Sequence, residues 1–139
     1  MELKKYKKID IAKQMLETAL DLYSKGEDYF SVLDLAGAAE EILGQHLKFK
    51  GITNSLESEK EAFILINKGL YQKDISDKDA LDFLNRIKNA IKHMGKKEKE
   101  VIADPKEDAE SMLDRAITNW WRLQEELTPK MNEFWIEGL

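Results

Sequence analysis

Apolar positions recur at steps of three and four residues along almost the whole chain, which is the spacing of one face of an α-helix. A first helix is predicted to end at Gly26, and a second to begin near Asp28 and end at Gly51. The inner face of the first is Ile9, Ala12, Leu16, Ala19, Leu20 and Tyr23. That of the second is Val32, Leu35, Ala36, Ala39, Ile42, Leu43 and Leu47. No segment shows strict alternation of apolar and polar residues, so no strand is predicted.

Two capping patterns predict the next helices. Ser58 and Glu61 have the spacing of a capping box, which starts a shorter third helix that closes around Gly69. Ser76 predicts the cap of a fourth helix that continues unbroken to Gly95. The apolar positions of the third helix are Phe63, Leu65 and Ile66. Those of the fourth are Leu81, Phe83, Leu84, Ile87, Ala90, Ile91 and Met94.

A long last helix follows a polar connector. Asp104 is its predicted N-cap and Pro105 its first-turn proline, while Pro129 should break it and leave a short terminal turn or helix. Its inner face is Ala109, Met112, Leu113, Ala116, Ile117, Trp120 and Leu127. Short connections between amphipathic helices favour antiparallel neighbours. We therefore predict one all-α domain over residues 1–139, an antiparallel up-and-down bundle of about five helices.

Composition narrows the classes of function. The 139 residues include no cysteine, which excludes disulfides and thiolate metal ligands. No other metal-binding cluster and no cofactor motif stands out, and no apolar run is long enough to cross a membrane, so we expect a cytoplasmic protein without metal or cofactor. The formal net charge of -5 argues against non-specific attraction to nucleic acid over the whole surface.

Basic residues gather in one segment of the predicted fourth helix and the connector after it. Residues 86–99 contain six basic side chains and a single acidic one, Glu98. Within this segment we predict nucleic-acid contacts for four lysines, namely Lys88, Lys92, Lys96 and Lys97. They form the one basic patch in an otherwise acidic chain.

Three polar residues of the same helix form a candidate catalytic strip. Arg86 and His93 are seven positions apart, so they fall within roughly 20° of each other on a helix, and Asn89 lies roughly 40° further round. These residue types suit attack of a ribose 2′-hydroxyl on the neighbouring phosphate. His93 would move the proton, Arg86 would hold the phosphate, and Asn89 would orient a hydroxyl or the imidazole.

The same residues also admit a purely structural interpretation. His93 would interact favourably with the negative end of the helix dipole, and Arg86 could pair with Asp82 one turn earlier. The lysines could form an ordinary solvated helix face. A lone histidine at such a position is more often structural than catalytic.

Other positions predict packing. The small residues of AGAAEEILG, residues 36–44, predict close approach of another helix, with Glu41 facing a basic neighbour. His46 lies on an apolar helix face and is expected to be a hydrogen-bonded core histidine. Adjacent tryptophans are about 100° apart on a helix, so Trp120 and Trp121 cannot both face inward. Trp121 is therefore a candidate for a subunit interface.

A small helical domain with an arginine, a polar residue and a histidine arranged as R-x4-6-H on a late helix resembles the HEPN (higher eukaryotes and prokaryotes nucleotide-binding) superfamily. Arg86 and His93 match this spacing, although Ile87 stands where catalytic members have a polar residue. An alternative alignment uses KNAIKH, with Lys88 in the arginine position and Asn89 and His93 in place. AGAAEEILG followed by N-x3-H also resembles a group of small bacterial HEPN-like proteins.

The resemblance implies a function and partners. Catalytic members of the superfamily are generally metal-independent ribonucleases that dimerise, and many act in toxin-antitoxin or antiviral defence systems. It therefore implies a homodimer that binds RNA or a nucleotide in a basic cleft, with a protein such as an antitoxin as a further partner. Catalysis would come from His93, Arg86 and Asn89. The alternative is an inactive helical dimerisation or protein-interaction module, which Ile87 and the acidic total favour.

Overall fold

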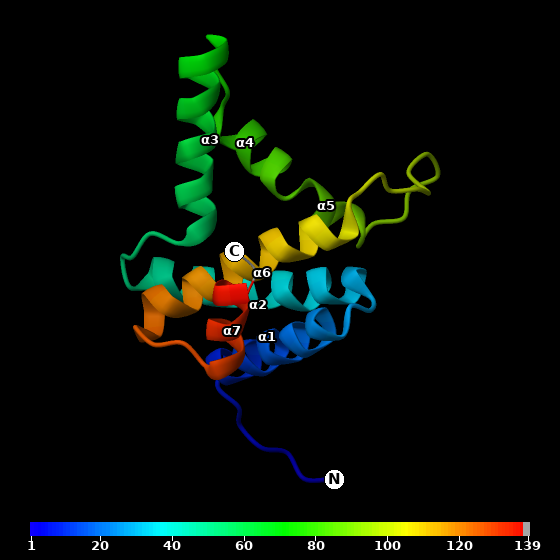
Figure 1. Cartoon of the computed structure of the whole chain (residues 1–139), viewed down its shortest axis with the longest axis vertical. Helices are drawn as coiled ribbons and strands as arrows, with labels where there is room; N and C mark the ends of the chain where they lie inside the picture. The colour runs from blue at the N-terminus through cyan, green and yellow to red at the C-terminus, as the bar shows by residue number, and fades with distance from the viewer. Residues whose placement is uncertain (138–139) are drawn as a thin grey trace.

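The chain is mostly helical in the part that the computed structural model describes, residues 1–137 (Figure 1). Seven α-helices lie within it: α1 (Lys8–Lys25), α2 (Tyr29–Phe49), α3 (Ser55–Tyr71), α4 (Asp77–Leu84), α5 (Arg86–Ala90), α6 (Pro105–Gln124) and α7 (Pro129–Glu137). The all-α prediction is confirmed. None of the helices in this range is both long and apolar enough to cross a membrane.

The hydrophobic core lies between three long helices. α2 packs against both α1 and α6, and α7 folds back onto α1 (Figure 1). The core consists of the apolar faces of these helices: Ala12, Leu16, Ala19, Leu20, Val32, Leu33, Ala36, Ala39, Leu43, Ala109, Met112, Leu113, Ala116, Ile117, Trp120 and Met131. Most of the residues that the sequence predicts as inner positions of these helices are therefore buried.

Several helix ends follow the local signals in the sequence. Gly26 ends α1 in the left-handed region at φ 70°, which glycine adopts without steric cost. The side chains of Asp28, Ser76 and Asp104 each accept a backbone N–H bond in the first turn of α2, α4 and α6. Pro105 opens α6 as predicted.

The predicted start of the third helix is wrong by three residues. α3 begins at Ser55, because the Asn54 side chain caps it by accepting the Glu57 N–H at 2.9 Å. The Ser58 hydroxyl, predicted to be the cap, instead accepts a hydrogen bond of 3.0 Å from the Arg122 guanidinium. Tertiary contact with α6 thus takes Ser58 away from the local role that its spacing predicts.

The predicted fourth helix is not continuous. It breaks at Asn85, which has φ -101° and ψ 7°, into α4 and the short α5. Arg115 of α6 donates to the Leu84 carbonyl at 3.2 Å and to Asn85 Oδ1 at 2.8 Å. The Leu84 carbonyl is therefore bound from outside the helix, where an unbroken helix would bond it internally. α5 ends at Ala90, so His93 lies outside any helix.

The last part of the chain follows the prediction more closely. α6 ends at Gln124, and α7 begins at Pro129, the residue predicted to break the helix. Leu127 lies in the connection rather than on the inner face of α6. Trp120 is buried and Trp121 is 45% exposed, which confirms that the two do not both face inward.

The prediction of a single up-and-down bundle of about five helices is not confirmed. α3 and α4 pack against each other and project from the layer of α1, α2 and α6 as an arm (Figure 1). The connection between α5 and α6, residues 91–104, projects separately as a long loop. We use "the arm" for residues 55–84.

Candidate functional site

A buried ionic network joins α2, α5 and α6. The Glu40 carboxylate lies 3.2 Å from the Lys88 amino group and 3.2 Å from the Arg115 guanidinium. The three side chains are at most 7% exposed. Burial of a charge is costly unless it is paired, and here one carboxylate faces two cations. The predicted ionic partner, Glu41, is an exposed residue that reaches Lys88 at 3.4 Å from the surface. Glu40 is instead the buried acid.

The network continues through Asn119 to the base of the arm. The Asn119 amide donates to the Glu40 carbonyl at 3.1 Å and accepts the Ser55 N–H at 2.8 Å. The Ser55 hydroxyl donates to the Arg115 carbonyl at 2.8 Å. Sequence reasoning missed Arg115 and Asn119. The signal was present, because these two polar residues are four apart, one helical turn, beside the apolar positions Met112 and Ala116 of α6.

Arg86, the predicted phosphate clamp, is engaged with its own helix turn. Its guanidinium lies 4.1 Å from the centre of the Phe83 ring and donates to the Phe83 carbonyl at 2.9 Å. It borders a cavity of about 220 Å³ between the arm and α6, together with Lys88 and Arg115. The acids Glu59, Glu107 and Asp108 line the same cavity. Three cations face three anions, so the cavity has no excess positive charge to attract a phosphate.

The carboxyl group of Glu59, which lines this cavity, has a raised pKa. Burial raises the pKa of its carboxyl, and the positive charge of Arg115 opposes the rise. The carboxylate lies 3.7 Å from the Arg115 Nε atom. The environment thus favours the neutral form of Glu59 more than water does.

Asn89 lies in α5 together with Arg86, but His93 does not belong to that helix. Asn89 is exposed on α5, and His93 is exposed in the loop that follows. His93 borders a separate cavity of about 220 Å³ within residues 90–101, and Arg86 does not line that cavity. The strip predicted from helical geometry is absent, because the helix ends before His93. Their predicted catalytic roles remain a hypothesis.

The four lysines predicted to bind nucleic acid have different environments. Lys88 is buried in the ionic network, and Lys92 lies 3.7 Å from the Asp34 carboxylate. Lys96 and Lys97 are exposed in the loop and have no ion-pair partner within residues 1–137. Two of the four lysines of the basic segment thus form ion pairs with acids of α2.

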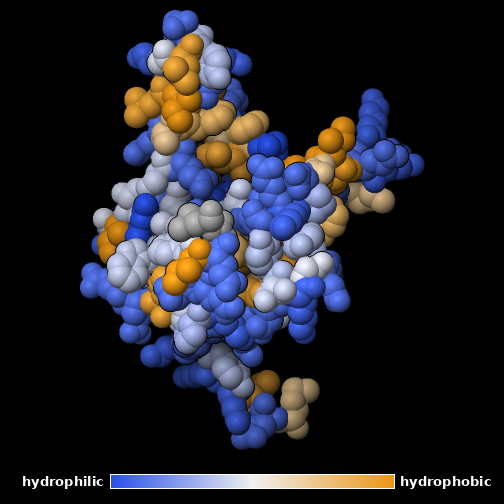
Figure 2. Space-filling view, viewed as in Figure 1, coloured by the Kyte–Doolittle hydropathy of each residue, from blue (hydrophilic) through white to orange (hydrophobic). Residues whose placement is uncertain are grey.

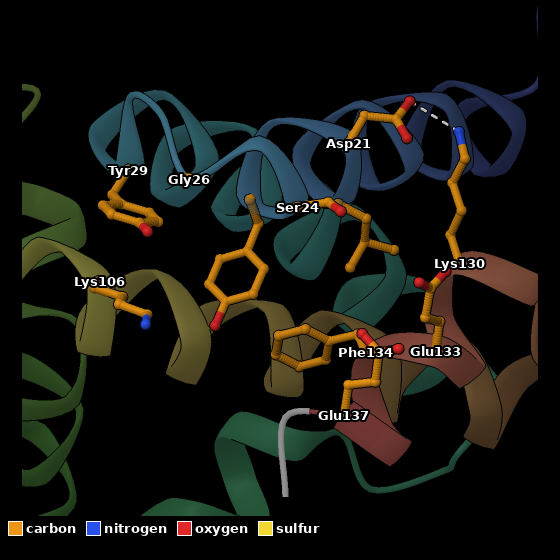
Figure 3. Close-up of a pocket in the computed structure, with 11 residues that line it drawn as sticks. Asp21, Ser24, Gly26, Tyr29, Lys106, Lys130, Glu133, Phe134 and Glu137 are labelled. Atoms are coloured by element: carbon orange, nitrogen blue, oxygen red, sulfur yellow. Dashed lines mark hydrogen bonds and ion pairs between the residues drawn. The ribbon is translucent and has the colours of Figure 1, made fainter.

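A larger cavity of about 470 Å³ opens between α1, α2, α6 and α7 (Figure 3). Tyr23 donates to the Glu110 carboxylate at 2.6 Å, and burial together with this bond raises the pKa of its hydroxyl above the usual range. Lys130 pairs with Asp21 at 2.8 Å on one side, and Lys106 lies on the other. Both acids and lysines line the opening, so its charge favours no single class of ligand.

His46 borders a fourth cavity, of about 530 Å³, beside α1. Its side chain is half-buried and makes no hydrogen bond to any residue of the described range. The prediction of a hydrogen-bonded core histidine is therefore wrong. The apolar face predicted for this position ends at the surface, next to the exposed ring of Phe49.

The arm carries the most prominent apolar surface. Leu65, Leu70 and Tyr71 are each 68% exposed and Ile66 is 52% exposed. Figure 2 shows apolar side chains gathered over the outer part of the arm. Of the 17 residues of α3, only Ser55 is buried. Large contiguous apolar patches on a protein surface mark interaction sites.

Only one face of α3 is covered within the chain. The Phe63 ring stacks on the Phe83 ring of α4 with 4.9 Å between their centres. Leu65 and Ile66, predicted as apolar positions of the same helix, face solvent. The arm therefore holds its two helices together through one face of α3 and leaves another open.

Within residues 1–137, no group of three or more histidine, cysteine, aspartate or glutamate side chains is arranged to hold a metal ion. The features that remain as candidate sites are the apolar surface of the arm and the loop with His93, Lys96 and Lys97. No protein-family model, curated protein or solved structure matches this chain.

Proposed function

We propose that this protein is a catalytically inactive helical interaction module that binds a protein partner through the arm. The supporting observation is the exposure of Leu65, Ile66, Leu70 and Tyr71 on a helix that its own core barely covers. Isolated helices of this length are marginal in water, and most helical stability comes from packing of an apolar face. A partner helix or surface would supply that packing.

The positions of the proposed catalytic residues favour this function over RNA cleavage. RNA cleavage by attack of the 2′-hydroxyl on the phosphate needs the imidazole and the guanidinium at one phosphate. Arg86 is held against Phe83, and the chain leaves the helix between Arg86 and His93. Lys88, the arginine substitute of the alternative alignment, is neutralised by Glu40. These contacts support a binding role without chemistry.

A second candidate is RNA or nucleotide binding by a HEPN-like, cytoplasmic homodimer. One observation favours it: the exposed His93, Lys96 and Lys97 share a loop that projects from the core (Figure 1). If the loop binds RNA, Lys96→Glu and Lys97→Glu weaken binding for every sequence and reduce its salt dependence. If the protein also cleaves RNA, His93→Ala and Arg86→Ala abolish cleavage of mixed RNA. If wild type and the two variants cleave mixed RNA equally, the catalytic hypothesis is wrong.

The interaction function is tested by site-specific photo-crosslinking in native host cells. A photoreactive residue in place of Leu65 should give a crosslinked adduct on illumination, because a bound partner covers this position. Ile136 on α7 is the matched control, since it is 67% exposed against 68% for Leu65 but lies away from the arm. The expected result is an adduct at Leu65 and none at Ile136.

Absence of an adduct at Leu65, with the protein present at its normal level, would contradict the proposed function. An adduct of equal yield at both positions would also contradict it, because the arm would then be no more occupied than any other exposed surface.

A further inference from the structure

We infer that the partner of the arm is a second copy of this chain, which packs its α3 antiparallel against the first; this inference rests on the proposed interaction function. The surface concerned, here "the α3 face", consists of Ala62, Leu65, Ile66, Gly69 and Leu70. At about 100° per residue these five positions fall within an arc of about 140°. That is the width of the apolar stripe of a helix that packs against another element. The stripe is open, because all five of its residues are exposed, while α4 covers Phe63 at its edge.

Gly69 indicates that the occupant is a closely approaching backbone. It lies within α3 and has no positive φ, so its backbone conformation does not require glycine. A Cβ atom added there would meet nothing within 4 Å, so packing in this chain does not require glycine either. Glycine is disfavoured inside helices but permits close approach of another backbone. Ala62 stands two turns before Gly69 on nearly the same helix line.

Residue sizes on the α3 face are self-complementary. In a two-fold symmetric pair the same surface patch meets itself. An antiparallel arrangement that places Ala62 opposite Gly69 of the partner subunit also places Leu65 opposite Ile66 of the partner subunit. Small residues thus meet small residues and branched aliphatic residues meet each other. A partner of different sequence would not require a single helix to carry the small pair, Ala62 and Gly69, and the aliphatic pair, Leu65 and Ile66, in symmetric positions.

Charges on one flank of the α3 face complement each other in the same arrangement. Glu61 and Lys68 lie within about 20° of each other, beside the apolar stripe. Both are exposed, and neither has an ion-pair partner within residues 1–137. A two-fold axis brings this flank against the same flank of the second copy. Glu61 then lies about 3 Å along the helix axis from Lys68 of the partner subunit, and the pair occurs twice.

The inference is tested with the purified full chain by sedimentation velocity over a wide range of concentration. We expect a species of twice the 16.1 kDa chain mass. Ile66→Glu places a charge in the middle of the α3 face and should give only the monomer. Ile136→Glu, on α7, should leave the dimer unchanged. Equal helical circular dichroism in all three proteins confirms that the variants fold.

A charge exchange tests the antiparallel register. Glu61→Lys and Lys68→Glu each replace two attractive pairs by two repulsive ones, so each should raise the dimer dissociation constant roughly threefold to tenfold. The double variant restores opposite charges and should return to within about twofold of wild type. A double variant weaker than either single variant overturns the register.

The outcomes separate this inference from the proposed function. A purified chain that stays monomeric at all concentrations, while Leu65 crosslinks to another protein in cells, overturns self-association and leaves the interaction module in place. A monomer without any adduct at Leu65 ends both. A dimer that Ile66→Glu does not disturb overturns the α3 face as the interface.

Discussion

α3 and α6 are helices of similar length with apolar residues at similar spacing, yet they differ greatly in how far they are buried. Eight of the 20 residues of α6 are buried, whereas α3 buries one of 17. α6 packs along its length on α2, while α3 meets the core only near its first turn. An amphipathic pattern thus predicts that a helix has an apolar face, but it does not predict whether another helix of the same chain packs against that face.

The two regions also differ in what holds them. The core is held by apolar packing, in which each fully buried side chain stabilises the fold by removing apolar area from water. The base of the arm is held by a few hydrogen bonds and charges around Glu40, Arg115 and Asn119. Hydrogen bonds are directional, so this network determines where the arm leaves the core.

The largest expected effect separates core from arm by truncation of a leucine in each. Leu113→Ala removes a side chain that is 0% exposed and should lower the free energy of unfolding by about 3 kcal/mol. Leu70→Ala removes one that is 68% exposed and should change the monomer by less than about 0.5 kcal/mol. Urea denaturation of each protein at a concentration where it is monomeric measures both values. Equal losses would contradict the division into core and arm.

The second largest effect is expected at the base of the arm, where Asn119 hydrogen-bonds Ser55 of α3 and Glu40 of α2. Asn119→Ala leaves the Ser55 N–H and the Glu40 carbonyl without their side-chain partner, at a cost of about 2 kcal/mol. Exchange of the Ser55 amide hydrogen should accelerate as the base of α3 loosens. Asn132→Ala, at an exposed asparagine of α7, is the control and should change neither quantity. Unchanged protection at Ser55 would show that the arm does not depend on the network.

A smaller effect has opposite signs for the monomer and the dimer. Gly69→Ala should stabilise the monomer by about 0.5–1 kcal/mol, because alanine is the better helix former and meets nothing within 4 Å. The same change should weaken the dimer, because the added methyl group keeps the second helix away. Thermal unfolding of the monomer and sedimentation of the dimer measure the two signs. A variant that gains stability and dimerises as well as wild type removes Gly69 from the interface.

The smallest expected effect is a dependence of folding stability on pH that comes from Glu59, near the base of the arm. Burial raises the folded-state pKa of Glu59, so its contribution to stability is full below the unfolded pKa and is lost as pH rises through the folded pKa. Glu59→Gln should therefore raise stability at pH 7 by roughly a few tenths of a kcal/mol, reduced by solvent screening of a side chain that is 39% exposed. The gain should shrink towards pH 4. Urea midpoints across this range measure it, and a gain that grows on acidification contradicts the cause.

Much of the helical pattern could be predicted, because its causes are local. Gly26, Ser76 and Pro105 act on the backbone within a few residues, and each stands at the helix end that its chemistry predicts. The candidate site was harder to predict. Its prediction assumed a regular helix from Arg86 to His93, but α5 ends at Ala90, before His93. Arg115, some 30 residues further along the chain, also binds Leu84 and Asn85, where the predicted helix is interrupted before Arg86.

By itself, the sequence determined that the chain is helical, where several helices begin or end, and which faces of α1, α2 and α6 are apolar. These properties follow from side-chain periodicity and capping, which act over one or two turns. The tertiary structure decided which acid is buried, that Lys88 pairs internally, and that the outer face of α3 stays open. Burial and ionic pairing depend on residues distant in the chain, so only the packed arrangement of helices determines them.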